Sequence, residues 1–255
     1  VLALQTENPE TLKAINRRNV SEEEIDDAIN WASKLNISTS TELIFGMPHD
    51  TKDSFVDLLD RSVDRGFDSV LCHNLFLMDG IQLNRPETRK KFGIKTKYRP
   101  LGTNYGEYGG EFVAEYEEVV VACDSFSYDD FLEIRNLNFM YYGVFALDFH
   151  KWFFQYLRNL DIKLSEFFIA FINPDRSKNW PKGYINFLDD LKNTIDGELH
   201  DTKEEVIATC QRIFESKGNS VGEPSRINVN LGARLIYRES SWIKEVFLQH
   251  LDELL

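Results

Sequence analysis

The sequence lacks the features that mark membrane proteins and general nucleic-acid binders. No apolar run approaches the roughly 18 residues that a membrane span requires, which predicts a soluble protein. Positive charge is in short supply: 29 Lys and Arg residues stand against 42 Asp and Glu, and the formal net charge is -13. Because neutralised phosphates supply most of the affinity for nucleic acid, we do not expect nucleic acid as a partner.

Cysteine is also scarce. The chain has three, Cys72, Cys123 and Cys210, which lie far apart and show no CxxC spacing. A disulfide framework uses an even number of cysteines, so we expect free thiols in a reducing compartment, with the cytoplasm as the default location. No second His or Cys pair lies at ligand spacing, and no metal site is predicted in this chain.

The residues that are present are sufficient for a globular fold. Hydrophobic residues make up 42% and aromatic residues 13% of the 255 residues, which excludes wholesale disorder and permits a full hydrophobic core. The chain opens on Val1 without a signal-peptide pattern and closes on a helix pattern without a capping glycine. We therefore expect the N-terminus, and by the same reasoning the C-terminus, to be a cut end of a longer chain.

Residues 1–80 alternate strand-like runs with amphipathic helices. Asn8 before Pro9 marks one helix start, and Ser21 with Glu24 forms a capping box that marks another. The expected order is strand 1–5, helix 9–17, helix 22–36, strand 40–45, a helix capped by Asp50 or Thr51 and closed by Gly66, and strand 67–78. Short connections of this kind indicate parallel βα units, in which active sites collect at the carboxyl ends of the strands.

The remainder of the chain has a different character. We predict a linker at 81–124, with a loop through 102–110 and one strand at 115–123, and a mainly helical domain at 125–255. Ser127 with Asp130 caps a long apolar, aromatic-rich helical run that extends through Leu160 and is broken or kinked near Gly143. Further helices are expected at 164–172, 184–195, 202–216 and 241–254.

The stretch TELIFGMPHDTKDSF, residues 41–55, runs from a strand through a tight turn into a helix. Gly46 permits close backbone approach, and the amino end of the next helix favours an anionic group, as at a cofactor or phosphate site. An ordinary structural βα turn without a ligand would account for the same residues. The turn alone leaves both interpretations open.

Several short pieces around this turn occur in a fixed order: Leu4-Gln5-Thr6, Asn8-Pro9-Glu10, Leu12-Lys13, Ile15-Asn16-Arg17-Arg18 and Glu42-Leu43-Ile44-Phe45-Gly46-Met47-Pro48. In this order and spacing, residues 1–80 resemble the later half of the radical S-adenosylmethionine (SAM) core, especially its cobalamin-binding branch. The resemblance implies an α/β fold: the later half of a (β/α) partial TIM-type barrel, followed here by the mainly helical domain. Members show Gly-Leu-Pro-Gly-Glu-Thr at the turn, where this chain has His49 and Asp50. Histidine is enriched at positive φ, so the turn is expected to survive.

The resemblance also implies a set of cofactor-binding residues. The strand ends at Gln5 and at Ile44 with Gly46 would face SAM together with Met47, and Arg17 would be a candidate for its carboxylate. Each has an ordinary alternative: Gln5 as a hydrogen-bonding residue at the barrel rim, Ile44 as core, and Arg17 as a cation at a helix end.

The implied chemistry is not complete in this chain. In such enzymes a reduced four-iron four-sulfur (4Fe-4S) cluster cleaves SAM to a 5′-deoxyadenosyl radical, and methylcobalamin often supplies a methyl group. The CxxxCxxC motif that would hold the cluster is absent from the 255 residues. The cluster ligands and any cobalamin domain are therefore expected outside this chain, which alone would be inactive. The intact enzyme would need an electron donor, such as flavodoxin or ferredoxin, and a substrate that the sequence does not identify.

Two alternatives remain open at this stage. One is a non-radical βα-barrel lyase or hydrolase with catalytic residues among Glu42, His49, Asp50 and His73. It predicts activity without iron. The other is a non-catalytic binding module, for which residues 125–255 would fold and bind a partner by themselves.

Overall fold

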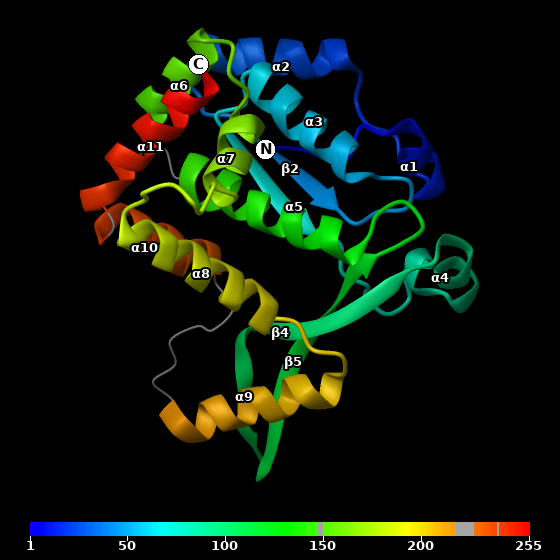
Figure 1. Cartoon of the computed structure of the whole chain (residues 1–255). Helices are drawn as coiled ribbons and strands as arrows, with labels where there is room; N and C mark the ends of the chain where they lie inside the picture. The colour runs from blue at the N-terminus through cyan, green and yellow to red at the C-terminus, as the bar shows by residue number, and fades with distance from the viewer. Residues whose placement is uncertain (147–149, 218–226, 239) are drawn as a thin grey trace.

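Three parallel strands form the sheet in the first part of the chain, in the order β1-β2-β3. The computed structural model describes residues 1–146, 150–217, 227–238 and 240–255. The strands and the helices that connect them are coloured blue to cyan in Figure 1 and comprise β1 (Leu2–Gln5), α1 (Pro9–Ala14), α2 (Glu22–Lys34), β2 (Ser40–Phe45), α3 (Lys52–Asp64) and β3 (Ser69–Asn74). The predicted parallel pairing of these strands is confirmed.

The helix starts follow the capping side chains that the sequence indicated. Oδ1 of Asn8 accepts hydrogen bonds from the first backbone N–H groups of α1, and the capping box of Ser21 and Glu24 opens α2. Thr51, and not Asp50, caps α3. Asp50 is instead buried, with 2% of its surface exposed.

The two faces of the sheet differ in burial. Leu43, Phe45 and Val70 are completely buried in the main core. Ile44 and His73, which pair across β2 and β3, are half-buried and exposed respectively. Because successive side chains of a strand point to opposite faces, one face carries the core and the other is left accessible for a site.

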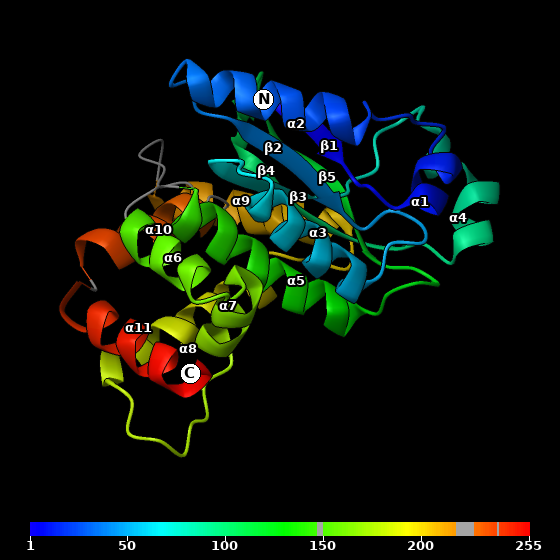
Figure 2. The same ribbon diagram turned by 90° about the horizontal axis from the view of Figure 1, so that it is seen from above.

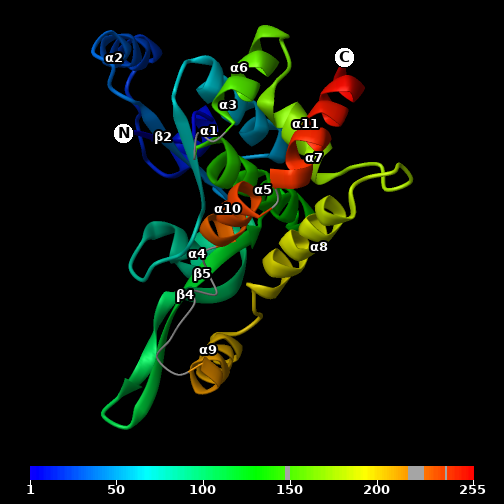
Figure 3. The same cartoon turned by 90° about the vertical axis from the view of Figure 1, so that its left-hand side faces the viewer.

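The segment 81–124 is not the loop-rich linker that we expected. It contains a single 3₁₀ turn (Gln82–Asn84), helix α4 (Pro86–Phe92) and two long antiparallel strands, β4 (Lys95–Tyr108) and β5 (Glu111–Ala122). The loop predicted at 102–110 was wrong, because Gly109 and Gly110, both at positive φ, form a two-residue hairpin turn between these strands. Figure 3 shows this ribbon projecting from the body, with α9 alongside it.

Strand β5 also pairs with the short segment that follows β3, outside the parallel sheet itself. The backbone N–H of Leu77 donates to the carbonyl of Glu118 at 2.7 Å, and that of Val120 donates to the carbonyl of Leu75 at 2.9 Å. The predicted strand 67–78 is therefore divided. Strand β3 ends at Asn74, the backbone N–H of Leu75 still donates to the carbonyl of Phe45 in β2 at 2.8 Å, and Phe76 then pairs with Val119 of β5. This pairing holds the ribbon at the carboxyl ends of the parallel strands.

The remainder is helical, as predicted. Figure 2 shows α5, α7, α8 and α11 gathered on one side of the strands. One helix, α10, was not predicted. The helices are α5 (Tyr128–Met140), α6 (Lys151–Asn159), α7 (Leu164–Ile172), α8 (Lys182–Gly197), α9 (Lys203–Lys217), α10 (Ile227–Tyr237) and α11 (Ser240–Leu254).

The break predicted near Gly143 is confirmed and has a packing reason. Helix α5 passes at Met140 into a π-helical turn, η2 (Tyr141–Phe145). Helix α10 crosses this turn at Gly232, where a Cβ atom would lie 2.8 Å from the carbonyl oxygen of Gly143. Glycine permits two backbones to approach this closely.

One continuous cluster of buried apolar side chains joins the sheet to the helices. A buried carboxylate reinforces it: Asp60 of α3 accepts hydrogen bonds from the hydroxyl of Tyr141 at 3.1 Å and from the backbone N–H and hydroxyl of Ser165 at 3.1 and 2.6 Å. A mixed α/β fold is therefore confirmed, whereas the partial barrel and the domain boundaries stay predictions. Among the described helices, none is long and apolar enough to cross a membrane.

Candidate functional site

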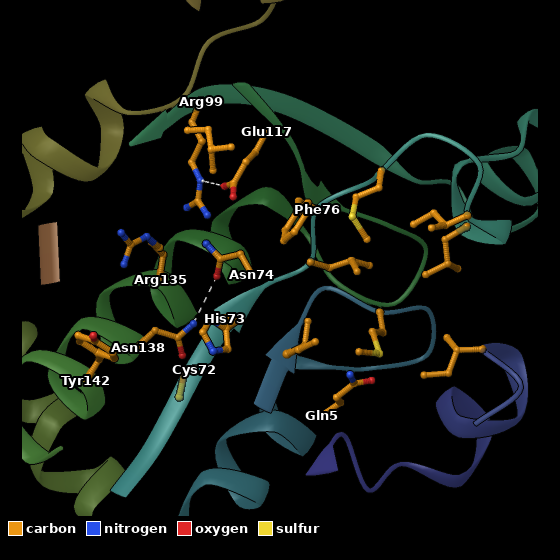
Figure 4. A pocket seen from close by; sticks show the side chains of 18 of the residues that line it. Gln5, Cys72, His73, Asn74, Phe76, Arg99, Glu117, Arg135, Asn138 and Tyr142 are labelled. Atoms are coloured by element: carbon orange, nitrogen blue, oxygen red, sulfur yellow. Dashed lines mark hydrogen bonds and ion pairs between the residues drawn. The ribbon is translucent and has the colours of Figure 1, made fainter. Parts of the chain in front are cut away.

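A cavity of about 1240 Å³ lies at the carboxyl ends of the parallel strands (Figure 4). Gln5, Ile44 and His73 line it from β1, β2 and β3, and side chains of β4, β5 and α5 line it from the other side. Ligand sites of parallel βα folds collect at this edge. Since a pocket for one drug-sized ligand measures roughly 300–1,000 Å³, this cavity has room for two small molecules.

Four of the predicted cofactor-binding residues, Gln5, Arg17, Ile44 and Met47, line this cavity. Gln5 has a φ of 62°, a left-handed conformation that is uncommon for residues other than glycine. Strain of this kind persists where the surrounding structure enforces it, and it clusters at ligand sites. The contact of these four residues with a cofactor stays a prediction.

Gly46, the fifth predicted residue, is not among the residues that line the cavity. It has a φ of 114°, and a Cβ atom there would lie 3.2 Å from Cβ of Leu75 and 3.6 Å from the carbonyl oxygen of Val120. The glycine therefore has a packing reason: it lets the turn pass close to the segment that pairs with β5. Its contact with a cofactor stays a prediction.

Arg17 is engaged with the edge of β1. Its Nη2 donates to the carbonyl of Ala3 at 2.6 Å, and its Nε donates to Oδ1 of Asn19 at 3.1 Å. The side-chain amide of Asn19 in turn donates to the carbonyls of Leu4 and Thr6 at 3.0 and 2.7 Å. A guanidinium group has five N–H donors, so these bonds leave donors for the predicted contact with a carboxylate.

A buried carboxylate, that of Asp50, holds the turn after β2 in place. Oδ1 of Asp50 accepts hydrogen bonds from the hydroxyls of Thr6 at 3.1 Å and Thr11 at 2.9 Å. Burial raises the pKa of Asp50 to about 6, although these two hydrogen bonds lower it. His49 adopts a φ of 71°, as expected for a histidine that replaces a turn glycine.

The four residues of the lyase or hydrolase alternative do not share one site. Of these, His73 lines the cavity, whereas Glu42, His49 and Asp50 do not. His49 is exposed and packs edge-on against Phe92 at 5.4 Å between ring centroids, and Asp50 is bonded to the two threonines.

One end of the cavity, which we call the polar end, is lined by Asn74, Arg99, Glu117, Arg135, Asn138 and Tyr142. Nε of Arg99 donates to Oε2 of Glu117 at 2.7 Å across the β4–β5 ribbon. Nε and Nη2 of Arg135 donate to the two carboxylate oxygens of Glu198 at 2.8 and 3.3 Å, and both side chains are buried. Each arginine of this end therefore has its own carboxylate partner.

The amides of the polar end are only partly satisfied. Nδ2 of Asn138 donates to Oδ1 of Asn74 at 3.4 Å, a long hydrogen bond between two buried side chains. Oδ1 of Asn138 has no hydrogen-bond partner among the described residues. A buried acceptor without a donor costs about 1–3 kcal/mol, which makes this oxygen a candidate contact for a ligand.

The polar end was not predicted from the sequence. Arg135, Asn138 and Tyr142 follow one another at spacings of three and four residues, which places them on one helix face and was the available signal. Arg99 and Glu117 belong to different strands, and Arg99 lay in a segment that was expected to be a linker. No local pattern brings these two groups together.

The described residues do not fit an iron–sulfur cluster. Cys72 is buried in the main core and Cys210 in the small apolar cluster between α9 and the ribbon. Burial raises the pKa of both thiols, whereas cluster ligands are thiolates. In the part of the chain that is described, no group of three His, Cys, Asp or Glu side chains is arranged to hold a metal ion. No reaction step through a cluster is assigned to this chain.

Comparison with known proteins gives a distant likeness. No family model matches the chain. It is similar to TokK, a cobalamin-dependent radical SAM methyltransferase of Streptomyces tokunonensis, with 26% identity over 152 residues, 57% of this chain and 22% of the relative. It is also similar to a 2-(S-pantetheinyl)-carbapenam-3-carboxylate methyltransferase of Streptantibioticus cattleyicolor, with 25% identity over 152 residues and the same coverage. The chain thus spans 22% of the length of these relatives, and the likeness supports the predicted family at a coarse level.

Proposed function

We propose that this chain forms the SAM-facing and substrate-facing part of a cobalamin-dependent radical SAM methyltransferase. The observation that carries the proposal is the cavity at the strand ends, where Gln5, Ile44 and Met47 come together. The distant likeness to two methyltransferases, one of them cobalamin-dependent and of the radical SAM type by name, supports the same class.

The chain's own residues would bind and orient SAM. Ile44 and Met47 give the cavity apolar surface against which an adenosyl group would pack. Gln5 would present its side-chain amide from a strained strand end, and the remaining N–H donors of Arg17 suit a carboxylate. When bound, SAM supplies the radical chemistry.

Other parts of the reaction would come from outside this chain. The 4Fe-4S cluster needs thiolate ligands that these 255 residues do not offer in a suitable arrangement, and a cobalamin domain would likewise be separate. An electron donor such as flavodoxin or ferredoxin would reduce the cluster. The non-radical alternative has less support, because three of its four residues lie away from the cavity.

Binding of SAM by the 255-residue chain tests the proposal. Equilibrium dialysis with radiolabelled SAM should show saturable binding, and Gln5→Gly should weaken it. Glycine accepts a positive φ without strain, so this variant should fold at least as well as the natural chain while lacking the amide. Ile44→Asp should also weaken binding, by placing a charge on the apolar wall.

Two controls accompany this measurement. Val113→Asp, at an exposed position of the ribbon outside the cavity, should leave SAM binding unchanged. After incubation with iron, sulfide and dithionite, this chain alone should form no 5′-deoxyadenosine. Absence of saturable SAM binding, or unchanged binding in both cavity variants, would overturn the proposal. So would an upstream coding sequence without CxxxCxxC about a hundred residues before Val1, a spacing expected from barrel size.

A further inference from the structure

We propose that the polar end of the cavity is a binding subsite for a carboxylate that carries an adjacent N–H or O–H group. In this assignment Arg99 holds the carboxylate and Asn138 accepts the hydrogen bond from the adjacent donor. The two side chains come from β4 and α5 and line the same end of the cavity (Figure 4).

Arg99 has donors to offer to an anion. Its hydrogen bond to Glu117 uses Nε, and Figure 4 draws the terminal amino groups pointing into the cavity, toward Arg135 and Asn74. These terminal groups form a planar fork that matches the two oxygens of a carboxylate. Glu117 fixes the guanidinium group before a ligand arrives, because its side chain is mostly buried and lies directly across the ribbon.

Asn138 supplies the second half of the recognition. The residue is 1% exposed, and its Oδ1 has no partner among the described residues although it belongs to the cavity wall. An oxygen in this position is available to accept a hydrogen bond from a ligand N–H or O–H group. The hydrogen bond from its Nδ2 to Asn74 gives the amide this orientation, with oxygen and not nitrogen left over.

The charges of the polar end favour a singly charged anion over a phosphate. Arg99 and Arg135 are each paired with a carboxylate, Glu117 and Glu198, so the four groups together are neutral. A carboxylate adds one negative charge to this set, whereas a phosphate dianion adds two beside the same glutamates. The second charge is therefore repelled by both glutamates without a further cation in this set to offset it.

The subsite is distinct from the predicted cofactor residues. Figure 4 shows Gln5 at the opposite side of the cavity from Arg99 and Arg135, and the cavity volume permits two small molecules. The assignment of the carboxylate ligand as the substrate rests on the proposed function. The ability of the polar end to bind such a carboxylate does not.

A titration of the ¹⁵N-labelled 255-residue chain, followed by amide NMR shifts, tests this subsite with four small probes. N-acetylglycine has both a carboxylate and an N–H group, its methyl ester lacks the charge, N-acetylsarcosine lacks the N–H group, and inorganic phosphate is the more highly charged anion. N-acetylglycine should bind at least about ten-fold more tightly than the ester or phosphate. It should bind about two- to ten-fold more tightly than N-acetylsarcosine.

Two variants assign these preferences to residues. Arg99→Gln should weaken binding of N-acetylglycine at least about ten-fold, whereas Arg176→Gln, at an exposed arginine paired with Asp189, should not change it. Asn138→Leu, which is similar in size, should retain carboxylate binding but lose the preference over N-acetylsarcosine. Since Asn138 is buried, the dispersion of the amide spectrum checks its fold, and Arg99→Gln tests the subsite independently.

The subsite is refuted if N-acetylglycine does not bind, if its ester or phosphate binds as tightly, or if Arg99→Gln has no effect. SAM, added as a fifth probe, separates the two proposals. If Arg99→Gln weakens SAM as much as N-acetylglycine, the polar end belongs to the cofactor and the substrate assignment is overturned. If SAM does not bind while N-acetylglycine does, the proposed function fails and the carboxylate subsite stands.

Discussion

Replacement of Asp50 by asparagine tests how the turn at the edge of the cavity is held. Asp50 is 2% exposed, accepts hydrogen bonds from Thr6 and Thr11 through Oδ1, and has no described donor to Oδ2. Burial raises its pKa from the ordinary value of 3.8 to about 6. At neutral pH the folded protein therefore carries a charged Asp50 that burial disfavours. The same carboxylate connects β1, α1 and the turn through its hydrogen bonds with Thr6 and Thr11.

The size of the effect follows from the two pKa values. Between pH 3.8 and about 6 the folded protein binds more protons at Asp50 than the unfolded chain does, so the free energy of unfolding falls as pH rises through this range and stays low above it. A difference of roughly two pKa units corresponds to about 3 kcal/mol. An asparagine at this position keeps the Oδ1 acceptor for the hydroxyls of both threonines and carries no charge. Its side-chain N–H groups would replace Oδ2, which has no hydrogen-bond partner among the described residues, and would therefore lack an acceptor.

We therefore expect Asp50→Asn to raise the free energy of unfolding at pH 8 by about 1–3 kcal/mol. At pH 5.5 the natural Asp50 is largely protonated in the folded state, so the gain should be smaller by about 0.8 kcal/mol. Urea unfolding, followed by tryptophan fluorescence at the two pH values, measures both quantities. Asp79→Asn, at an exposed aspartate, is the control and should stay within about 0.5 kcal/mol of the natural chain.

A lower stability of Asp50→Asn at pH 8 would refute this reasoning. It would mean that the charged form of Asp50 is favoured in the fold, and that the two threonine hydroxyls outweigh burial. A gain that is the same at both pH values would also contradict it, because the gain would then not arise from the titration of this carboxyl group.

Two further predictions concern packing and a buried histidine. Gly232→Ala should destabilise the protein by about 1–3 kcal/mol, because its Cβ would lie 2.8 Å from the carbonyl of Gly143, whereas Gly197→Ala, with open space around it, should be neutral or slightly stabilising. Equal melting temperatures for the two variants would contradict the close contact. Burial lowers the pKa of His250 to about 4, so the contribution of this residue to the free energy of unfolding should fall as pH drops below about 6.5, by about 1.4 kcal/mol between pH 8 and 5.5, opposite in sign to that of Asp50. His250→Gln should lose less in urea unfolding at these two pH values, and an equal loss would show that His250 is not the group responsible.

The sequence predicted the parts of the fold that depend on neighbouring residues. Asn8, Ser21 and Ser127 start helices in the structure, because a capping side chain bonds to backbone groups two or three residues away and needs no tertiary partner. Gly109 and Gly110 carried an equally local signal for a hairpin. The signal was missed because the flanking strands, rich in polar residues, do not alternate as half-buried strands do.

The candidate site was predicted in part. Gln5, Ile44 and Met47 were chosen from the family resemblance. They lie at or just after the ends of parallel strands, whose carboxyl ends meet at one edge, and all three line the cavity there. The function of Asp50 as a buried carboxylate did not follow. Its partners Thr6 and Thr11 are about forty residues away in the chain.

The sequence by itself thus determined the order of strands and helices, the caps that start them and one wall of the cavity. Only the tertiary structure decided the other wall. Arg99, Arg135 and Asn138 meet because β5 pairs with the segment after β3 and α5 packs beside that strand. Hydrogen bonds and packing between distant segments depend on the whole fold, and no spacing along the chain encodes them.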